Sequence, residues 1–575
     1  MEKIWLVGEE NVVSSEIAYL CERFKIEQTI AKLLWQRGLR KEDDVIQFFK
    51  PSLNDLHDPF LMRDMKEAVN LLSDTIDERK KILLFGDYDV DGTTAVATMY
   101  LGLKEVHENL LYYIPDRYAE GYGLSIQGID YAKQQECTLI IALDCGVKAN
   151  EKISYARGLG IDVIVCDHHE PGTELPDAII LDPKREDCAY PFKELSGCGV
   201  GFKLLQALYQ QKNVPDHKLF SLLDFVAISI GADIVSVTGE NRILAFHGLG
   251  LLNTQPRLFV QKIAEISVKK LPFSLTDVVF ILAPRINAAG RIRSGIHAVD
   301  MMLSTDEEGI NELVVAINND NTTRRGLDEN ITKEALGIIA ADEKYNKSKC
   351  TIVYHPNWHK GVVGIVASRL IETHHRPTIV LTKSKGMLTG SARSIPQFNL
   401  YNALVYCQDY LEQFGGHEYA AGLTLKEENL DLFRERFELY VQEFLTDEML
   451  IPLQKVDMKI DLNEIFCNQS GTKIPRLKNA IDAFEPFGPG NMKPVFLTQN
   501  LFATDTKVLK EKHLKLRVRQ PNNNVQLDAI GFGLSKKELE AASGVPFEMA
   551  YTIELNEFNG HTNVQLNIKD LREML

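Results

Sequence analysis

The stretch Lys81–Thr94, KILLFGDYDVDGTT, decides how this chain folds. It opens with an apolar run of strand length and then places three carboxylates close together, at Asp87, Asp89 and Asp91. Carboxylates at this spacing repel one another, so a bound cation is the simplest reason to keep them together. From Gly92 onward, small and apolar residues recur at helical spacing. The stretch therefore predicts a strand, an acidic loop that forms a metal site, and a helix.

The same pattern returns twice further along the chain. The run TLIIAL (138–143) ends at Asp144, and IDVIVC (161–166) ends at Asp167, His168 and His169. Runs that are apolar on both faces and separated by helix-length segments are typical of a parallel sheet. In such sheets ligands bind beyond the carboxyl ends of the strands, which is where all three acidic clusters fall. We expect the clusters to meet at one edge of the sheet.

Asp233 follows a helical segment in the stretch SIGADIV and completes an oxygen-rich set of donors. Such a set suits Mg²⁺ or Mn²⁺ better than Zn²⁺, and the imidazole favours Mn²⁺. The predicted ligands are Asp87, Asp89, Asp144, His168 and Asp233, while Asp91 and Gly92 shape the turn and the helix start. Singly, each acid can be a turn or helix cap, and each histidine a surface or core residue. Together they predict a two-metal site that hydrolyses a phosphoester.

Composition narrows the class of protein. The chain has 575 residues, 45% of them hydrophobic, and a formal net charge of −16, so any binding of a polyanion must be local. The nine cysteines are scattered without a CxxC pair, which argues against a disulfide framework or a structural zinc site. No apolar run has the length of a membrane span, and the start MEKIWLVGEE turns acidic too early for a secretory signal. We expect a soluble, cytoplasmic protein without membrane contact.

The pattern predicts five regions along the chain. They are a mostly helical segment (1–78), an α/β catalytic domain (79–304), a long connecting helix (305–345), a smaller α/β domain (346–448) and a C-terminal β-barrel (449–575). In the barrel, apolar Leu514, Leu516 and Val518 alternate with Lys515, Arg517 and Arg519, which predicts a basic stripe on one strand. Asn559 and Gly560 mark a hairpin. Phe532 and Phe558 either stack on nucleic-acid bases or belong to the core.

Several arginines are candidates for phosphate contacts, because a guanidinium pairs bidentately with phosphate. Arg117 follows the apolar run LYYIP, and Arg285 and Arg291 flank what reads as a small-residue turn that contains Asn287. Arg324 and Arg325 are adjacent on the connecting helix. Such groups could hold a 5′-terminal phosphate and set the polarity of attack, whereas the alternative reading is ordinary surface arginines.

The motifs DYDVDG (87–92) and DHH (167–169) resemble the DHH phosphoesterase superfamily. Further motifs resemble those of the superfamily members that degrade single-stranded DNA from the 5′ end. These motifs are IPDRYAEGYGL (114–124), PRINAAGR (284–291), WHKGVVGIVASRL (358–370), GGHEYAAG (415–422) and EPFGPGN (485–491). The resemblance implies a parallel-sheet DHH catalytic domain, a DHH-associated domain and an OB-type barrel. It also implies metal-dependent release of 5′-mononucleotides in DNA recombination and repair.

The resemblance adds roles for single residues. It implies that the five predicted ligands hold two Mn²⁺ or Mg²⁺ ions, with Asp144 and His168 in the chemistry and His169 near the scissile phosphate. In the DHH-associated domain it implies substrate contacts at His359, Arg393, Gly415, Gly416 and His417; a structural turn is the rival reading for the two glycines. Single-strand-binding protein, helicase and recombination proteins are the implied partners.

Two other functions compete with this interpretation. A DHH phosphodiesterase acting on short oligonucleotides or cyclic dinucleotides would share the metal site but has little use for a barrel with a basic stripe. A catalytically dead DNA-binding scaffold predicts lost ligands, and all five predicted ligand positions carry metal-binding side chains. The sequence therefore favours the exonuclease.

Overall fold

The computed structural model describes residues 2–8, 14–466, 474–521, 524–558 and 560–574. The chain forms two compact units. The smaller unit contains Met1–Gly8, Thr322–Lys459 and Lys569–Arg572, and the larger unit contains Glu9–Asn321, Ile460–Ile568 and Glu573–Leu575. Within the described ranges, no helix combines the length and the apolar character that a membrane crossing requires.

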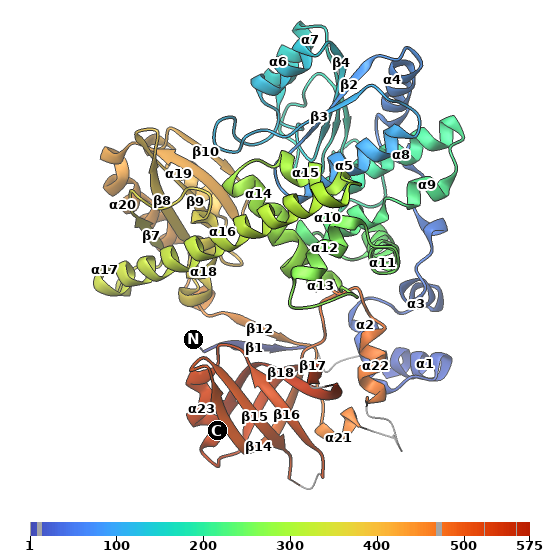
Figure 1. Cartoon of the computed structure of the whole chain (residues 1–575). Helices are drawn as coiled ribbons and strands as arrows, with labels where there is room; N and C mark the ends of the chain where they lie inside the picture. Colours follow the sequence, from blue (N-terminus) through green and yellow to red (C-terminus); the bar gives the residue numbers. More distant parts are fainter. Residues whose placement is uncertain (1, 9–13, 467–473, 522–523, 559, 575) are drawn as a thin grey trace. The chain divides into compact units, whose positions relative to one another are not determined.

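The catalytic domain of the larger unit is built on one parallel sheet, as the apolar runs predict (Figure 1). Its strands, in spatial order, are β3 (Leu110–Tyr113), β2 (Lys81–Gly86), β4 (Cys137–Leu143), β5 (Asp162–Cys166) and β6 (Ile179–Leu181). The register pairs Gly86 with Leu143 and Leu143 with Cys166, so these three strands end level. The residues that follow them therefore meet at one edge of the sheet.

Helices cover both faces of this sheet, which explains why its strands are apolar throughout. Two hydrophobic cores result, one on each face. One face packs against α4 (Met65–Asp77), α5 (Val90–Lys104) and α8 (Gly197–Lys212), and the other against α6 (Ile126–Gln134) and α7 (Asn150–Gly158).

Further helices of the larger unit precede and follow this sheet in the chain. Before the sheet lie α1 (Ser14–Phe24), α2 (Gln28–Gln36) and α3 (Glu42–Phe49). After it come α9 (Asp216–Phe220), α10 (Leu223–Ala232), α11 (Gly239–Thr254), α12 (Leu258–Ile266), α13 (Leu275–Asp277), α14 (Ala283–Ile292) and α15 (Ile296–Leu303). The turn expected between Arg285 and Arg291 is wrong, because PRINAAGR forms α14. Proline at the first helical turn and consecutive alanines favour a helix there.

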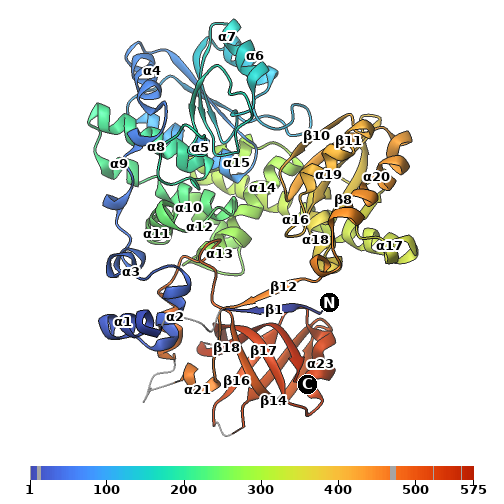
Figure 2. The ribbon, with the colours of Figure 1, turned by 180° about the vertical axis from the view of Figure 1, so that it is seen from behind.

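Helix α16 (Glu307–Ala341) is the long helix that the sequence predicts between the two α/β domains. The smaller unit continues with α17 (Lys344–Lys347), β7 (Thr351–Tyr354), α18 (Val363–His374), β8 (Thr378–Ser384), β9 (Met387–Arg393), α19 (Leu400–Tyr406), β10 (Gln413–Gly416), β11 (Ala420–Leu425) and α20 (Leu430–Phe444) (Figure 2). Its sheet has the order β10-β11-β9-β8-β7, with only the β7–β8 pair parallel.

The N-terminal region is not wholly helical. Strand β1 (Ile4–Val7) pairs in parallel with β12 (Leu453–Val456), more than 400 positions away in sequence. The Trp5 indole also donates a hydrogen bond of 2.9 Å to Asp570 Oδ2. The sequence pattern of β1 cannot predict this pairing, because the four residues of the strand do not specify a partner so far along the chain.

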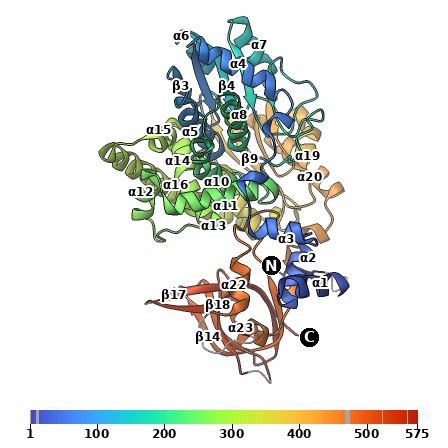
Figure 3. The same ribbon diagram turned by 90° about the vertical axis from the view of Figure 1, so that its right-hand side faces the viewer.

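The C-terminal sheet closes into a barrel (Figure 3). Its strands are β13 (Met458–Lys459), β14 (Phe496–Leu509), β15 (His513–Arg519), β16 (Gln526–Gly531), β17 (Phe547–Phe558) and β18 (His561–Glu573), with α21 (Leu462–Ile465), α22 (Arg476–Asp482) and α23 (Glu538–Ala542) between them. Pairing of β14 with both β15 and β17 closes the sheet. Leu514, Leu516 and Val518 face inward, as their alternation predicts. Gly560 begins the turn into β18; the expected hairpin residue Asn559 lies outside the described residues.

Candidate active site

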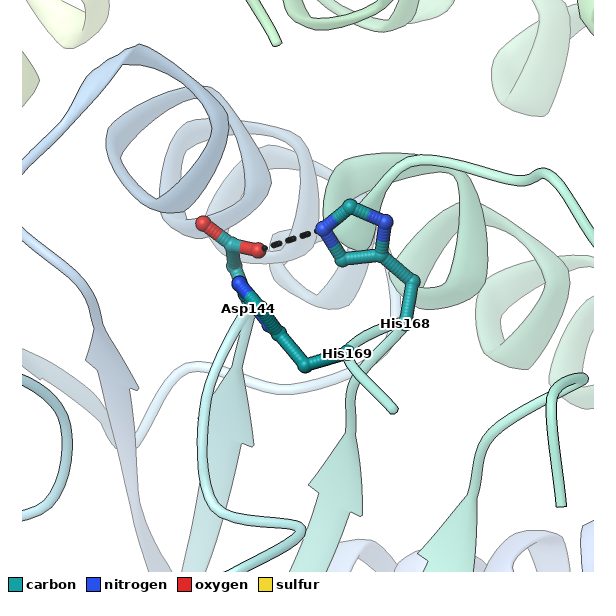
Figure 4. Close-up of side chains that lie close together, drawn as sticks. All are labelled: Asp144, His168 and His169. Atoms are coloured by element: carbon teal, nitrogen blue, oxygen red, sulfur yellow. Dashed lines mark ion pairs between the residues drawn. The ribbon is translucent and has the colours of Figure 1, made fainter. Parts of the chain in front are cut away.

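The ends of β2, β4 and β5 bring the sequence-predicted acids and histidines together. His168 Nε2 lies 3.2 Å from Asp144 Oδ1 and 3.5 Å from Asp233 Oδ2. Figure 4 shows the Asp144 carboxylate facing the His168 ring. Asp233 comes from the C-terminal end of α10, which is not part of the sheet. One cluster therefore collects side chains from three strand ends and a helix end.

Three groups in this cluster could each hold a metal ion. They are Asp87 with Asp89 and Asp144, Asp91 with His168 and Asp233, and Asp144 with His168 and His169; in each group the ligand atoms lie within 4.8 Å of one another. Asp144 and His168 each belong to two groups. Shared ligands are what a pair of neighbouring metal ions requires.

The electrostatics of the cluster favour a cation. Burial, and then the neighbouring carboxylates, raise the pKa values of Asp87, Asp144 and Asp233. Asp144 Oδ1 is buried and has no hydrogen-bond partner among the described residues. Burial also lowers the pKa of His168, which keeps its imidazole in the neutral form that binds metals. Divalent ions would remove the repulsion between the carboxylates and bind Asp144 Oδ1, so these residues fit Mn²⁺ or Mg²⁺.

Asp91 is part of the cluster, a role that sequence reasoning missed. Its buried carboxylate lies 3.6 Å from His168 Nε2. It also accepts hydrogen bonds from the backbone N–H groups of Gly197 (2.7 Å) and Cys198 (2.8 Å), and from Ser229 Oγ (2.6 Å). Asp91 thus ties the first turn of α8 and the helix α10 to the acidic loop. The regular spacing of Asp87, Asp89 and Asp91 was a signal for this role, because it gives no reason to separate the third acid from the first two.

Two glycines allow this close packing. A Cβ at Gly197 would lie 2.6 Å from Asp144 Oδ1, and a Cβ at Gly92 would lie 2.4 Å from the Asp87 carbonyl oxygen. Both contacts are far inside van der Waals distance. Any side chain at either position would displace a candidate ligand.

His169 points to a different partner from His168. Its Nδ1 lies 2.7 Å from Asp167 Oδ1, and the Tyr122 hydroxyl lies 3.1 Å from its Nε2. Burial lowers the pKa of His169, but the hydrogen bond to Asp167 outweighs this and raises it to about 9. His169 is therefore a charged donor beside the cluster at neutral pH.

Asp182 is a further carboxylate at a strand end that the sequence did not single out. It follows β6, is fully buried, and accepts a hydrogen bond of 2.8 Å from the backbone N–H of Lys184 through Oδ1. Its Oδ2 has no hydrogen-bond partner among the described residues. Burial raises the pKa of Asp182 to about 7.

The candidate arginines of the larger unit differ in the groups that they contact. The Arg117 guanidinium lies 4.7 Å from the centre of the Tyr88 ring, inside the acidic loop. Arg285 donates to Asn318 Oδ1 (3.2 Å) and to its own helix at the Ile281 carbonyl (2.7 Å). Arg291 and Asn287 lie on α14, whose Gly290 packs against the Tyr88 carbonyl oxygen, so that a Cβ there would be 2.6 Å away. Arg117 and α14 therefore border the cluster.

Arg324 and Arg325 belong to the smaller unit. Arg324 is half-buried beside Asp328, and Arg369 makes an ion pair of 2.8 Å with the same carboxylate. Arg325 is exposed. The two arginines are thus not equivalent, because Arg325 is exposed to solvent and Arg324 is only partly exposed.

The other candidates of the smaller unit gather at one end of its hairpin. Strand pairing places Ala420 opposite Arg393, and the Ala420 carbonyl accepts a hydrogen bond from the His417 backbone N–H (2.8 Å). Gly416 has φ +148°, and a Cβ there would lie 2.3 Å from the Ala420 carbonyl, so it has a structural reason to be glycine. Gly415 faces open space. His359 Nδ1 accepts a hydrogen bond from the Gly361 N–H (3.1 Å).

The barrel exposes the predicted stripe of Lys515, Arg517 and Arg519. Arg517 makes an ion pair of 3.0 Å with Asp528 on β16, which neutralises part of the stripe. Phe532 is 60% exposed, so it is not a core residue. The side chain of Phe558 lies outside the described residues.

Comparison with known proteins finds matches along most of the chain. Models of the DHH family N-terminal domain, the DHHA1 domain and the RecJ OB domain match residues 81–230, 346–443 and 456–570. The single-stranded-DNA-specific exonuclease RecJ of Bacillus subtilis is 36% identical over 561 residues, which cover 96% of this chain and 69% of the relative.

Solved structures agree with this match. The crystal structure of Thermus thermophilus RecJ in complex with Mn²⁺ superposes with a TM-score of 0.85 at 25% identity, covering 100% of this chain and 80% of that one. The same protein in complex with Mg²⁺ gives a TM-score of 0.77 at 25% identity, with 100% and 79% covered. The fold is thus the predicted parallel-sheet DHH domain with a long helix, a DHH-associated domain and an OB-type barrel. The chain therefore belongs to the RecJ family, within the wider DHH family.

Proposed function

We propose that this chain is a metal-dependent exonuclease that hydrolyses single-stranded DNA from the 5′ end and releases 5′-mononucleotides. The observation that carries the proposal is the acidic cluster around Asp144 and His168, in a chain whose relatives are single-stranded-DNA-specific exonucleases. Phosphoester hydrolysis is the reaction that a pair of divalent ions held by shared carboxylates performs most directly.

The ligands we assign are Asp87, Asp89, Asp144, His168 and Asp233, with Asp91 as an additional donor to the His168 side. Bound divalent ions would supply Lewis-acid polarisation of the phosphoryl oxygens and a lowered pKa for an attacking water. Both Mn²⁺ and Mg²⁺ fit this donor set, and structures of the Thermus relative hold either ion. We propose Mn²⁺ as the preferred ion because of the imidazole.

His169 has a separate role in this proposal. Asp167 holds its Nδ1 and keeps the ring protonated, while its Nε2 lies beside the Tyr122 hydroxyl. A fixed positive donor next to the cluster stabilises the negative charge that develops on the phosphoryl group. His169 therefore contacts the scissile phosphate without holding a metal in this assignment.

Arginines next to the cluster set the polarity in this proposal. Arg117, fixed against Tyr88, and Arg291, on α14, border the acidic loop and suit a terminal 5′ phosphate. We assign further backbone phosphates to Arg285 and Asn287 in the larger unit and to the barrel stripe. In the smaller unit we assign them to His359, Arg393, Gly415, Gly416, His417 and Arg325, and less directly to the half-buried Arg324.

The cellular setting follows from the substrate. We propose a role in DNA recombination and repair, with single-strand-binding protein, helicase and recombination proteins as partners that deliver single strands. The described cysteines all carry free thiols, which supports action in the reducing cytoplasm.

A panel of substrates tests the proposal. With Mn²⁺, we expect the protein to degrade a long single strand, and we expect a duplex of the same sequence to resist. EDTA should stop the reaction. If only dinucleotides or cyclic dinucleotides were hydrolysed, the short-substrate phosphodiesterase would replace the exonuclease.

A further inference from the structure

A cavity of about 360 Å³ lies within the larger unit, and no residue of the acidic cluster lines it. Its walls come from the segment around Lys269 and α13, from the segment Glu485 to Lys493, and from the outer faces of β16, β17 and β18. This volume is at the lower end of the range for small-molecule sites, which spans roughly 300 to 1,000 Å³. The cavity is therefore large enough for one small ligand.

Phe532 supplies an aromatic surface to this cavity. It stands between Gly531 and Gly533 in the loop after β16 and is 60% exposed. The loop is fixed, because the Gly533 N–H donates to His513 Nδ1 (3.1 Å) and the His513 ring meets the Phe532 ring edge-on at 5.3 Å. An exposed ring held in a fixed orientation is suited to stacking on a flat ligand.

Three polar side chains line the cavity without partners. Gln565 and Asn567 are half-buried on β18, and Glu485, which is exposed, comes from the segment Glu485 to Lys493. Among the described residues, none of these three side chains has a hydrogen-bond partner. The two amides offer donors and acceptors, and the carboxylate accepts from amino groups. A ligand with several hydrogen-bonding edges would satisfy them.

Charge decides the kind of ligand. Lys269 is paired with Asp277, and Lys493 makes an ion pair of 2.8 Å with Glu554. Both cations of the cavity are therefore already paired with carboxylates, and Glu485 adds an acidic group beside them whose pKa is raised by burial and by Asp482. A phosphate would gain little here, whereas a neutral, flat molecule with polar edges fits.

We propose that this cavity binds one nucleobase, stacked on Phe532 and hydrogen-bonded by Gln565, Asn567 and Glu485. A base with an exocyclic amino group is favoured over thymine, because Glu485 can only accept when ionised. The base belongs either to the strand being digested or to a free mononucleotide. A row of outward residues on neighbouring β-strands favours the DNA being digested as the source of the base. The row leads across the barrel into the cavity and consists of Lys507, Lys515, Ile530 and Asn567, each paired with the next. The proposal rests on the exonuclease function.

Fluorescence of 2-aminopurine tests the proposal. Single strands that carry the probe at successive positions are bound to the full-length protein in EDTA, with fluorescence anisotropy of an end label confirming binding. We expect one position, or two neighbouring ones, to show quenching by stacking. Phe532→Ala should abolish the quenching at that position, and Leu539→Ala, which removes another exposed side chain of the larger unit, should not.

A parallel arm uses 2-aminopurine deoxyribonucleoside monophosphate. Quenching of the free nucleotide that is lost in Phe532→Ala assigns the cavity to the reaction product, and quenching only within strands assigns it to the substrate. The proposal is overturned if Phe532→Ala leaves every signal unchanged or if no position is quenched. Either result would leave the exonuclease function standing, since hydrolysis with Mn²⁺ is measured separately.

Discussion

Asp144 occupies a strained position for a residue with a side chain. Its φ of +59° lies in the left-handed region, which costs a non-glycine residue roughly 1 kcal/mol or more. The backbone is held there because the Asp144 N–H donates to the Cys166 carbonyl (2.8 Å) at the end of the neighbouring strand. The sheet thus fixes a carboxylate where a glycine would be easier to accommodate.

Replacing this carboxylate should remove hydrolysis and spare the fold. Asp144→Asn keeps the shape and tolerates the left-handed backbone, but loses the charge that a metal ligand needs. We expect activity on single strands to fall roughly 10³-fold, because metal ions supply several kcal/mol to the transition state. DNA binding, measured by anisotropy, should remain. Asp162→Asn, at the exposed opposite end of β5, is the matched control and should retain activity.

Gly197→Ala tests the close packing of α8 against the cluster. The added Cβ would lie 2.6 Å from Asp144 Oδ1, so the ligand must move. We expect the Mn²⁺ concentration needed for half-maximal activity to rise at least about 10-fold, as displaced metal ligands commonly cause. Gly250→Ala on α11, where a Cβ meets nothing within 4 Å, should leave this Mn²⁺ concentration unchanged. Equal behaviour of the two variants would contradict the packing argument.

Asp182 gives a pH-dependent prediction. Its pKa is raised from 3.8 to about 7, so the folded state keeps a proton that the unfolded chain releases. The unfolding free energy therefore falls as pH rises from about 4 to 7, by at most about 4 kcal/mol. Asp182→Asn has no carboxyl group to titrate, so its unfolding free energy should not fall in this way as pH rises. In EDTA, we expect the variant to exceed the parent in Tm more at pH 8 than at pH 5; an equal difference at both values would show that Asp182 titrates normally.

At the scale of elements, the EPFGPGN segment has a role that its sequence does not reveal. Arg242 on α11 donates to the Phe484, Glu485 and Phe48 carbonyls, each at 3.0 Å. Asn491 donates to the Phe484 carbonyl (2.8 Å) and Pro486 carbonyl (3.0 Å), and the Val237 N–H donates to the Pro489 carbonyl (2.7 Å). The segment is thus fastened to α11 and to the loop before it.

Arg242→Ala should loosen this segment. It removes the Arg242 hydrogen bonds to the Glu485 and Phe48 carbonyls and one of the two to the Phe484 carbonyl, which we expect to cost about 3 kcal/mol of unfolding free energy. The measurement is thermal unfolding together with limited proteolysis, where new cleavage should map to residues 484–495. Arg63→Ala removes only surface ion pairs with Asp64 and Asp187 and should have little effect. Unchanged protease resistance in Arg242→Ala would contradict the fastening role.

Elements whose pattern is local could be predicted from sequence. The apolar runs predict β2, β4 and β5, and the alternation around Leu514 predicts β15. Helix α14 was mistaken for a turn because its glycine and asparagine resemble a loop, while packing of Gly290 on the Tyr88 carbonyl decides the outcome. The hydrogen bonds of Asp91 could not be predicted, since its partners Gly197 and Ser229 lie more than 100 positions away.

At the scale of the whole molecule, each of the two compact units is built from segments that are far apart in the sequence. The N-terminal strand β1 and residues 569–572 join the smaller unit, whereas most of the barrel belongs to the larger one. The five sequence regions did not include this exchange, because it depends on contacts between the two ends of the chain. The acidic cluster, in contrast, lies wholly within the larger unit, which is why consecutive strand ends sufficed to predict most of it.

The central claim is that the Asp144 cluster hydrolyses single strands from the 5′ end. The direct measurement follows two copies of one oligonucleotide, labelled at the 5′ or the 3′ end, during digestion with Mn²⁺. We predict that the 5′ label appears at once as a mononucleotide, that the 3′ label stays on shortening strands, and that Asp144→Asn releases neither. Early release of the 3′ label, or unchanged digestion by Asp144→Asn, would contradict the account.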